Sequence, residues 1–424
     1  MTITYDPHDR AYLDAADARA ERDRVFDLCH GCRLCWNLCP SFETLFELID
    51  EKHGDDPTAL TEGEHDRIVD ECFQCKLCYL KCPYVPPHEW ELDFPRLMMR
   101  SLSIQHAEGK VDRSAAVLAR TDLQGKVATT MPGVVNAANR TPWIRRAMEK
   151  TVGIASDRLL PNFAKVRFSR WFGSHPRRPD PPNGEVTLFP TCIVEYQDPA
   201  IGEDMVRVYE RNGVGCDLPE GQVCCGMPWL DAGDVDRFMK HAEKNVGVLD
   251  EAATSGRPIV VPQPTCAYVL KNEYPEYLKS DAARRVAGAV QDVTEHLTGL
   301  HQDGRLDTDF DGDVPESVVW HAACHYRAQQ MGPRSRQLLE LTGARVEVVE
   351  KCSAIDGTWG LRAENVELAR EVARPLMRTV EESDATLVAG DCHLANTAID
   401  EATGRTPTHP VQILARAYGL TDDD

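Results

Sequence analysis

Apolar residues recur at helical spacing through the first part of the chain. In residues 9–28 the sparse apolar positions fit one side of a helix, and FETLFELIDE at 42–51 repeats this spacing. Thr61, followed three residues later by Glu64, has the form of a capping box at the start of another helix. The first part of the chain is therefore predicted to be helical.

From residue 185 onward, short β-branched runs alternate with helical stretches, and this alternation occurs twice. The first copy contains the strands EVTLF and IVVPQ, with helices near 200–212 and 232–253. The second copy contains the strands SVVWHA, RVEVVE and ATLVAG, with helices near 334–342 and 361–381. Alternation of this kind favours small parallel α/β modules, and its repetition indicates an internal duplication.

Two cysteine runs of the same form lie in the helical first part. They are CHGCRLCWNLCP at residues 29–40 and CFQCKLCYLKCP at residues 72–83. Each has the spacing C-x2-C-x2-C-x3-C-P, with which bacterial two-cluster ferredoxins hold [4Fe–4S] clusters. Three thiolates from one loop reach three corners of a cube, and the fourth cysteine crosses to the other cluster. We therefore assign one cluster to Cys29, Cys32, Cys35 and Cys82, and the other to Cys72, Cys75, Cys78 and Cys39.

The N-terminus and the composition indicate where such a protein works. The N-terminal residues are charged and contain no apolar core of a signal peptide, and no apolar run is long enough to cross a bilayer. We therefore expect a protein of the cytoplasm, either free or peripheral on the inner face of the membrane. In that reducing compartment the 16 cysteines are expected to be metal ligands or redox groups and not disulfides. Two matched runs also favour iron–sulfur clusters over zinc.

Charge is distributed unevenly, because the net charge is -21 while residues 97–178 hold more Lys and Arg than Asp and Glu. Three interpretations stay open: a solvated helical surface, a docking face for an acidic partner subunit, and a peripheral membrane contact through residues 96–178. The segment alternates basic residues such as Arg145 with aromatic residues such as Trp143 and Phe168, a mixture expected at lipid headgroups. The acidic remainder and the lack of a reader motif disfavour nucleic-acid binding.

Most cysteines of the second part follow predicted strands, where open α/β sheets place their ligands. The first copy, module one, holds four cysteines, enough for one cluster: Cys192, Cys224, Cys225 and Cys266. The second copy, module two, holds three: Cys324, Cys352 and Cys392. Candidate substitutes for the missing thiolate lie nearby: His321, His325, His393 and Asp391. Cys216 lies outside the pattern and is expected to be an inert core thiol.

The order of Cys192, then Cys224–Cys225–Gly226, then Cys266 resembles the CCG cysteine-rich domain, which occurs in tandem in heterodisulfide reductases and in lactate-utilisation proteins. Two ferredoxin runs followed by tandem CCG domains are most similar to the iron–sulfur subunits of anaerobic glycerol-3-phosphate dehydrogenase and glycolate oxidase. The chain departs from that pattern, because the family's third element, C-x-x-C, is here Cys266-Ala-Tyr-Val. In module two the cysteine pair is reduced to Cys352, and the closing element is Cys392-His-Leu-Ala.

These observations predict an α+β multidomain protein with four segments. Prolines after the second cysteine run and the stretch PRRPDPPNG at 176–184 mark two boundaries. A length of 424 residues is also too great for one core. The segments are a helical ferredoxin-like dicluster domain at 1–95, a basic helical connector at 96–184, module one at 185–313 and module two at 314–424.

The resemblance implies an iron–sulfur subunit that passes electrons from a partner flavoprotein dehydrogenase, of the glycerol-3-phosphate or 2-hydroxy-acid type, through two [4Fe–4S] clusters to a CCG site. Quinone or another acceptor would take the electrons from there. The chain shows no strand followed by GxGxxG and no P-loop, so we expect no dinucleotide site and no complete enzyme in this chain alone. The alternative is a thiol/disulfide reductase similar to heterodisulfide reductase, with catalysis in module one.

Under either function the four module-one cysteines are candidate catalytic residues and candidate ligands of a third cluster, cubane or non-cubane. Module two supplies weaker candidates: Cys324, Cys352, Cys392, His325 and His393. A scaffold that only binds clusters is the least favoured function.

Overall fold

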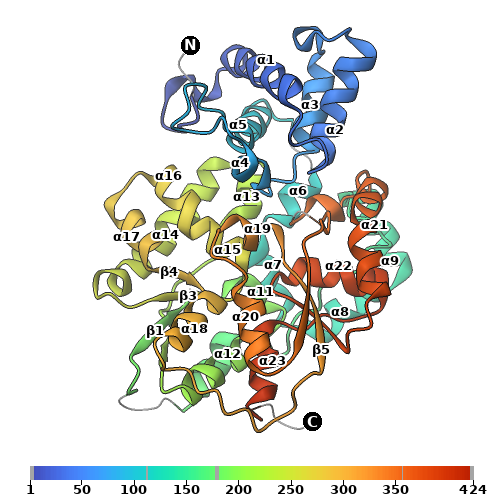
Figure 1. The fold of residues 1–424 in the computed structure, drawn as a ribbon. Helices are drawn as coiled ribbons and strands as arrows, with labels where there is room; N and C mark the ends of the chain where they lie inside the picture. The colour runs from blue at the N-terminus through green and yellow to red at the C-terminus, as the bar shows by residue number, and fades with distance from the viewer. Residues whose placement is uncertain (1–3, 111–112, 177–180, 356, 421–424) are drawn as a thin grey trace. The chain divides into compact units, whose positions relative to one another are not determined.

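The computed structural model describes residues 4–110, 113–176, 181–355 and 357–420, and the chain forms two compact units (Figure 1). The first unit comprises Met1–Ala119, Pro228–Phe238 and Asp356–Trp359. The second unit comprises Arg120–Met227, Met239–Ile355 and Gly360–Asp424. The four-segment division made from the sequence stays a prediction, and the two units are described one at a time below.

The first unit is helical, as predicted. Its core is aromatic, with the rings of Phe42 and Phe94 4.4 Å apart between centroids and Phe26 stacked on the buried His65. The α-helices of its N-terminal segment are α1 (Ala15–Cys32), α2 (Pro40–Glu47), α3 (Glu62–Asp70), α4 (Leu77–Lys81), α5 (Phe94–Ala107) and α6 (Arg113–Leu118). Short 3-10 or π turns precede or join them: η1 (Arg10–Leu13), η2 (Leu48–Lys52) and η3 (Pro57–Ala59).

The start of the chain differs from the single helix predicted over residues 9–28. Asp14 interrupts it, because its carboxylate accepts hydrogen bonds from the backbone N–H groups of Ala16 and Asp17 and so begins a new helix. The capping box predicted at the start of α3 is confirmed, since the Glu64 carboxylate accepts from the backbone N–H of Thr61 at 2.9 Å.

The second unit contains two parallel sheets, one for each predicted module. The first sheet has the order β2-β1-β3-β4 and the second has the order β6-β5-β7. The strands are β1 (Glu185–Leu188), β2 (Gly215–Asp217), β3 (Ile259–Val261), β4 (Val290–Asp292), β5 (Ser317–His321), β6 (Arg345–Val349) and β7 (Leu387–Gly390). The five strands predicted from β-branched runs are confirmed, and the short strands β2 and β4 were not predicted.

Helices flank both sheets of the second unit. The first module carries α11 (Thr191–Tyr196), α12 (Pro199–Arg211), α14 (Val235–Thr254) from Met239 onward, α15 (Pro264–Tyr268), η4 (Val269–Glu273), α16 (Tyr274–Leu278), α17 (Asp281–Ala289) and α18 (Val293–Gln302). From Pro228 on, α13 (Met227–Asp231) belongs to the first unit, as does the start of α14. The second module carries α19 (Cys324–Ala328), α20 (Arg334–Leu341), η5 (Trp359–Leu361), α21 (Val366–Glu382), α22 (His393–Thr403) and α23 (Pro410–Ala417).

The two modules share a core instead of folding separately. Leu414 of α23 belongs to the same buried cluster as Met205 of α12 and Leu188 of β1. A buried polar group also joins the modules, because the Ser335 hydroxyl lies 3.2 Å from the Thr294 hydroxyl and donates to Asp391 at 2.6 Å. The last helix of the chain therefore stabilises both sheets at once.

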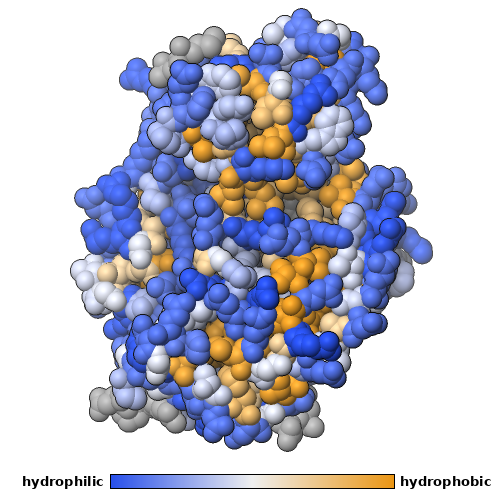
Figure 2. Space-filling view, in the orientation of Figure 1, coloured by the Kyte–Doolittle hydropathy of each residue, from blue (hydrophilic) through white to orange (hydrophobic). Residues whose placement is uncertain are grey.

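The connector predicted between the modules and the ferredoxin runs is helical, as expected. Its second-unit helices are α7 (Thr121–Ala128), α8 (Pro132–Arg140), α9 (Pro142–Val152) and α10 (Phe168–Ser174). Part of the linker predicted at 176–184 lies outside the described residues. In the part of the chain that the structure describes, no helix has the length and apolar character needed to span a bilayer. The face drawn in Figure 2 is mostly hydrophilic, with smaller hydrophobic patches.

Candidate iron–sulfur centres

The two ferredoxin runs have matching local geometry. Cys29 and Cys32 lie on the last turn of α1, and Cys78 lies on α4. Between the second and third cysteine of each run stands a residue in the left-handed region, Arg33 with φ of 54° and Lys76 with φ of 63°. This turn reverses the chain, so the third cysteine can face the first two across the loop.

The thiols of the two runs shift one another's pKa, mainly within two groups. Burial raises the pKa of Cys29 well above its usual value, and Cys35, Cys82 and Cys32 raise it further. Burial likewise raises the pKa of Cys78, followed by the effects of Cys75, Cys72, Cys39 and Cys35. Buried, mutually repelling thiolates need a compensating positive charge, which iron supplies in thiolate-bound clusters. The donor set therefore fits iron–sulfur clusters.

Hydrogen-bond donors surround the sulfur atoms of both runs. The Cys82 sulfur accepts backbone hydrogen bonds from Tyr84 and Val85. The Gln74 amide donates to the Cys72 sulfur at 3.5 Å, and the buried Lys76 ammonium donates to the Gln74 carbonyl at 3.0 Å. Hydrogen bonds to sulfur raise the reduction potential of a cluster by stabilising its reduced form. The second run thus carries a charged group close to its ligands that the sequence analysis did not single out.

The four module-one cysteines lie together at the carboxyl ends of strands. Cys192 stands on α11 after β1, Cys224 and Cys225 lie in the loop before α13, and Cys266 lies on α15 after β3. The Cys224 sulfur shares hydrogen bonds with the thiols of Cys192 and Cys225, and Cys225 also bonds Cys266. These bonds hold the pKa of Cys224 well below its usual value, whereas the pKa values of Cys192 and Cys225 are raised. The sequence-predicted set is therefore assembled in one place.

The backbone around the adjacent cysteines is tightly held. Gly226 has φ of 92°, the sharp turn expected after the cysteine pair. The Tyr274 hydroxyl donates to the Cys225 carbonyl at 2.9 Å, and the Asn245 amide donates to the Cys224 carbonyl at 3.2 Å. His241 Nδ1 lies 3.1 Å from the same Cys224 carbonyl. These contacts fix the directions of two thiols at once.

Two further residues of this site come from the connector helix α7. The Asp122 carboxylate accepts a hydrogen bond from the Cys224 backbone N–H at 2.9 Å, and the neighbouring Thr121 lowers the pKa of the Cys224 thiol. Burial raises the pKa of Asp122, and Cys224 adds to that shift. Sequence analysis missed both residues, although Gly125 inside the helical TDLQGKVA was a signal of close packing.

Gly125 allows α7 to approach the site. A Cβ atom at this position would lie 2.3 Å from Cγ of Tyr196, a residue of α11 beside the module-one cysteines. Only glycine fits such an approach, despite its low helix propensity.

The three module-two cysteines lie at the carboxyl ends of the strands of the second sheet. Cys324 begins α19 after β5, Cys352 follows β6, and Cys392 is the N-cap of α22 after β7. The Cys352 sulfur accepts a backbone hydrogen bond from Ala354 at 3.3 Å. Cys216, by contrast, packs against the apolar core from β2, as expected for a core thiol.

The candidate substitute ligands of module two each contact another group, although Nδ1 of His321 is buried without a hydrogen-bond partner among the described residues. His321 Nε2 lies 2.9 Å from the Lys351 carbonyl, and burial lowers the pKa of this histidine to about 4. His325 Nδ1 lies 3.1 Å from the Thr265 hydroxyl of module one. Asp391 accepts hydrogen bonds from Ser335 and from the Trp320 indole. His393 lies 3.9 Å from Asp198.

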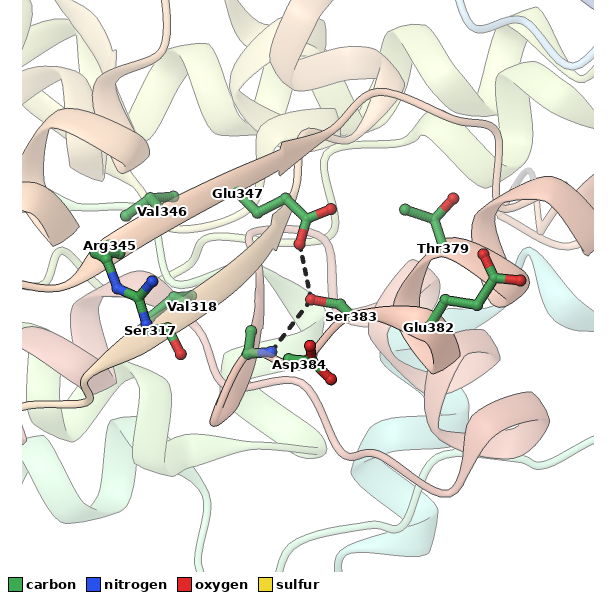
Figure 3. Close-up of a pocket in the computed structure, with 10 residues that line it drawn as sticks. Ser317, Val318, Arg345, Val346, Glu347, Thr379, Glu382, Ser383 and Asp384 are labelled. Atoms are coloured by element: carbon green, nitrogen blue, oxygen red, sulfur yellow. Dashed lines mark hydrogen bonds between the residues drawn. The ribbon is translucent and has the colours of Figure 1, made fainter.

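An open cavity of about 530 Å³ lies at the opposite end of the strands of the second sheet (Figure 3). Ser317 begins β5 and Arg345 begins β6, so this cavity opens at the amino ends of the strands, whereas the cysteines follow the carboxyl ends. Its charged lining, including Glu347 and Glu382, holds no cysteine. The cavity is therefore separate from the cysteine sites.

Comparison with known families matches both parts of the chain. Residues 186–271 and 318–399 match the cysteine-rich domain called CCG. Residues 21–108 match the Fer4-like domain of citrate utilization protein B.

Named relatives match long stretches of the chain. One subunit of the anaerobic glycerol-3-phosphate dehydrogenase of Escherichia coli (strain K12) is 31% identical over 322 residues, which cover 74% of this chain and 81% of the relative. Lactate utilization protein A of Bacillus pumilus (strain SAFR-032) is 27% identical over 215 residues, 49% of this chain and 87% of the relative. The chain therefore belongs to the family of iron–sulfur electron-transfer subunits of oxidoreductases that combine a Fer4-like domain with tandem CCG domains.

Proposed function

We propose that the chain is the iron–sulfur subunit of a dehydrogenase complex in which a flavin is bound by a partner flavoprotein. Electrons would pass from that flavoprotein, of the glycerol-3-phosphate or 2-hydroxy-acid type, through two [4Fe–4S] clusters to module one, and then to quinone or another acceptor. The observation that carries this proposal is the grouping of the cysteines into two sets in the first unit and a third set in module one. Similarity to one subunit of the anaerobic glycerol-3-phosphate dehydrogenase supports the existence of such a partner.

The crossed assignment of the ferredoxin cysteines is part of this proposal. The neighbours that act on Cys29 are members of its own proposed set, including Cys82 from the other run. The neighbours of Cys78 include Cys39 from the other run. Cys75 also acts on Cys35, so the two sets lie close enough for their charges to interact. That proximity supports electron transfer from one cluster to the next.

The chemistry divides between the clusters and the chain. Bound clusters would supply one-electron steps, which a two-electron flavin donor needs in order to release electrons singly. The chain supplies the thiolates, the donors that set the potential, and the burial that excludes water from Cys72 and Cys78. In module one, Asp122 from α7 holds the backbone of Cys224 in place.

The exposed residues of 121–166, which we call the connector face, support contact with a membrane surface. Leu123, Val127 and Trp143 have exposed fractions of 57%, 61% and 69%. None of the residues of α8, all of which the structure describes, is buried. Exposed Lys126 and Arg146 add positive charge. Exposed apolar and basic side chains together favour the headgroup layer of an anionic membrane.

Part of the basic and aromatic mixture predicted for this contact is instead structural. Arg145 is buried and donates to the carbonyl of Arg158, whose own guanidinium pairs with Glu401 at 2.8 Å. Phe168 and Phe172 are buried in the core of the second unit. The sequence pattern could not separate these residues from the exposed ones, because short helices present charged side chains on both faces.

A thiol/disulfide reductase remains the second candidate function, and one observation favours it. The hydrogen bonds to Cys224 lower its pKa, and a thiolate is the nucleophile in thiol–disulfide exchange. In that case module one would be the catalytic site.

Anaerobic affinity purification of the full chain from its own cells tests the proposal. We expect a flavoprotein to co-purify in equal amount, and at least two clusters per chain by iron and acid-labile sulfide. Adding the dehydrogenase substrate should bleach the broad thiolate-to-iron absorption at about 400 nm. Bleaching by a dithiol alone, with no flavoprotein present, would favour the reductase. Zinc in place of iron would contradict both functions.

A further inference from the structure

The loop that carries Cys266 is held by residues of the other module. The Gln263 side-chain carbonyl accepts a hydrogen bond from the backbone N–H of His393 at 3.0 Å. His409 Nε2 donates to the Pro262 carbonyl at 2.9 Å, since His409 Nδ1 accepts from a backbone N–H. Thr265 bonds His325, whose ring also lies 5.2 Å from the ring of Tyr268. Module two therefore contacts residues 262–268 along their length, and Figure 1 shows α15 beside α19.

Cys392 directly precedes His393, whose backbone makes one of these contacts. It is the N-cap of α22, where the backbone N–H groups of the first turn have no partner within the helix, although its side chain makes no capping hydrogen bond among the described residues. N–H groups at a helix start favour a thiolate. The backbone N–H of the next residue, His393, donates to Gln263, three residues before Cys266, so Cys392 and Cys266 lie on adjoining segments of the two modules.

Module one lacks the second cysteine of the family's C-x-x-C element, and Cys392 can supply a thiolate in its place. The residue three positions after Cys266 is Val269, which is fully buried and offers no ligand. Cys266 itself is buried, whereas Cys392 is half-buried at the same module boundary.

We propose that Cys392 of module two is a ligand of the module-one centre, which is then a composite site held by Cys192, Cys224, Cys225, Cys266 and Cys392. This inference rests on the proposed function of module one as a cluster site. It also gives module two a role that needs no cluster of its own, since the module positions one sulfur through Gln263, Thr265 and Pro262.

The test compares serine variants of the full chain, purified anaerobically and reconstituted with iron and sulfide. Cys266→Ser defines the EPR signal of the module-one centre, and Cys352→Ser is the matched control at the same sheet edge as Cys392. We expect Cys392→Ser to remove or shift the signal that Cys266→Ser removes, because oxygen is a poorer ligand for such a centre than thiolate. Cys352→Ser should leave that signal as in the unchanged protein.

A second variant covers the case in which Cys392→Ser disturbs folding. Cys392→His keeps a ligand that iron accepts, so we expect it to retain iron while the g values of the module-one signal change. Unchanged g values in both Cys392 variants, with the signal still sensitive to Cys266→Ser, would overturn the inference alone. If Cys266→Ser changes neither iron nor EPR, module one binds no cluster, and the proposed function of that module falls with it.

Discussion

At the residue scale, the crossed assignment depends on two cysteines of the same run. Cys35 and Cys39 are near neighbours in sequence, yet they are assigned to different clusters. Replacing Cys35 by serine should therefore weaken one cluster signal, and replacing Cys39 the other, since oxygen ligates such clusters poorly. EPR spectra of the two reduced variants decide the matter. If both substitutions remove the same signal, each run binds its own cluster.

Asp122 offers a second test at this scale, because it accepts a hydrogen bond from the backbone of Cys224. Asp122→Asn keeps the shape and removes a negative charge near the cysteines. We expect the reduction potential of the module-one centre to rise by about 60 mV, which is about 1.4 kcal/mol for a one-electron couple. A redox titration followed by EPR measures it, with iron content unchanged. Asp250→Asn, which removes a carboxylate paired with Arg285 elsewhere, should leave the potential unaltered.

The sequence predicted ligands better than it predicted their supports. Cysteine spacing identifies thiols that one loop brings together, and the structure assembles Cys192, Cys224, Cys225 and Cys266 accordingly. Asp122 lies 102 residues before its partner, so no local spacing connects the two. Polar residues that serve a site from a distant element look like ordinary surface residues until the chain is folded.

At the element scale, α7 should respond sharply to one added methyl group. Alanine normally stabilises a helix by about 1 kcal/mol relative to glycine. At Gly125, however, the new Cβ would lie 2.3 Å from Cγ of Tyr196, so the helix must move away from α11. We expect Gly125→Ala to lower the thermal unfolding midpoint and to alter the module-one EPR signal, because Thr121 and Asp122 move with the helix.

Gly133 in α8 is the matched control for this prediction. A Cβ at Gly133 would meet nothing within 4 Å, so Gly133→Ala should leave the EPR signal unchanged and raise stability by at most about 1 kcal/mol. Equal behaviour of the two variants in differential scanning calorimetry and EPR would show that α7 does not need its close approach to Tyr196.

Strand prediction at this scale followed the β-branched content of each strand. The predicted strands, including the edge strand β6 (RVEVV), contain β-branched residues, which favour extended backbone. The edge strands β2 and β4 are only three residues long, GCD and VQD, and carry no β-branched run. Backbone pairing with a neighbour creates such strands, and pairing is not visible in a single sequence.

At the scale of the whole second unit, the duplicated sequence pattern predicted two modules but not the core that they share. Each module has its own sheet, yet α23 completes the core of the first module and His409 bonds the loop before Cys266. The periodic pattern repeats within each copy, whereas the contacts between copies involve single residues outside the repeat. For this reason the sequence indicated two sites of unequal quality, whereas we propose one site built by both copies.

The connector face provides the last prediction, since its exposed hydrophobic and basic residues have no role in the sheets. We expect the protein to sediment with vesicles that contain phosphatidylglycerol and much less with neutral phosphatidylcholine vesicles. Binding should weaken with added salt, because charges in water are screened beyond about 8 Å at physiological ionic strength. Replacing Leu123, Val127 and Trp143 by glutamine should reduce binding at least about tenfold, the effect of about 1.4 kcal/mol. Leu13→Gln, at a residue 53% exposed outside this face, should not reduce it, and failure of the unchanged protein to bind either vesicle would contradict a membrane role.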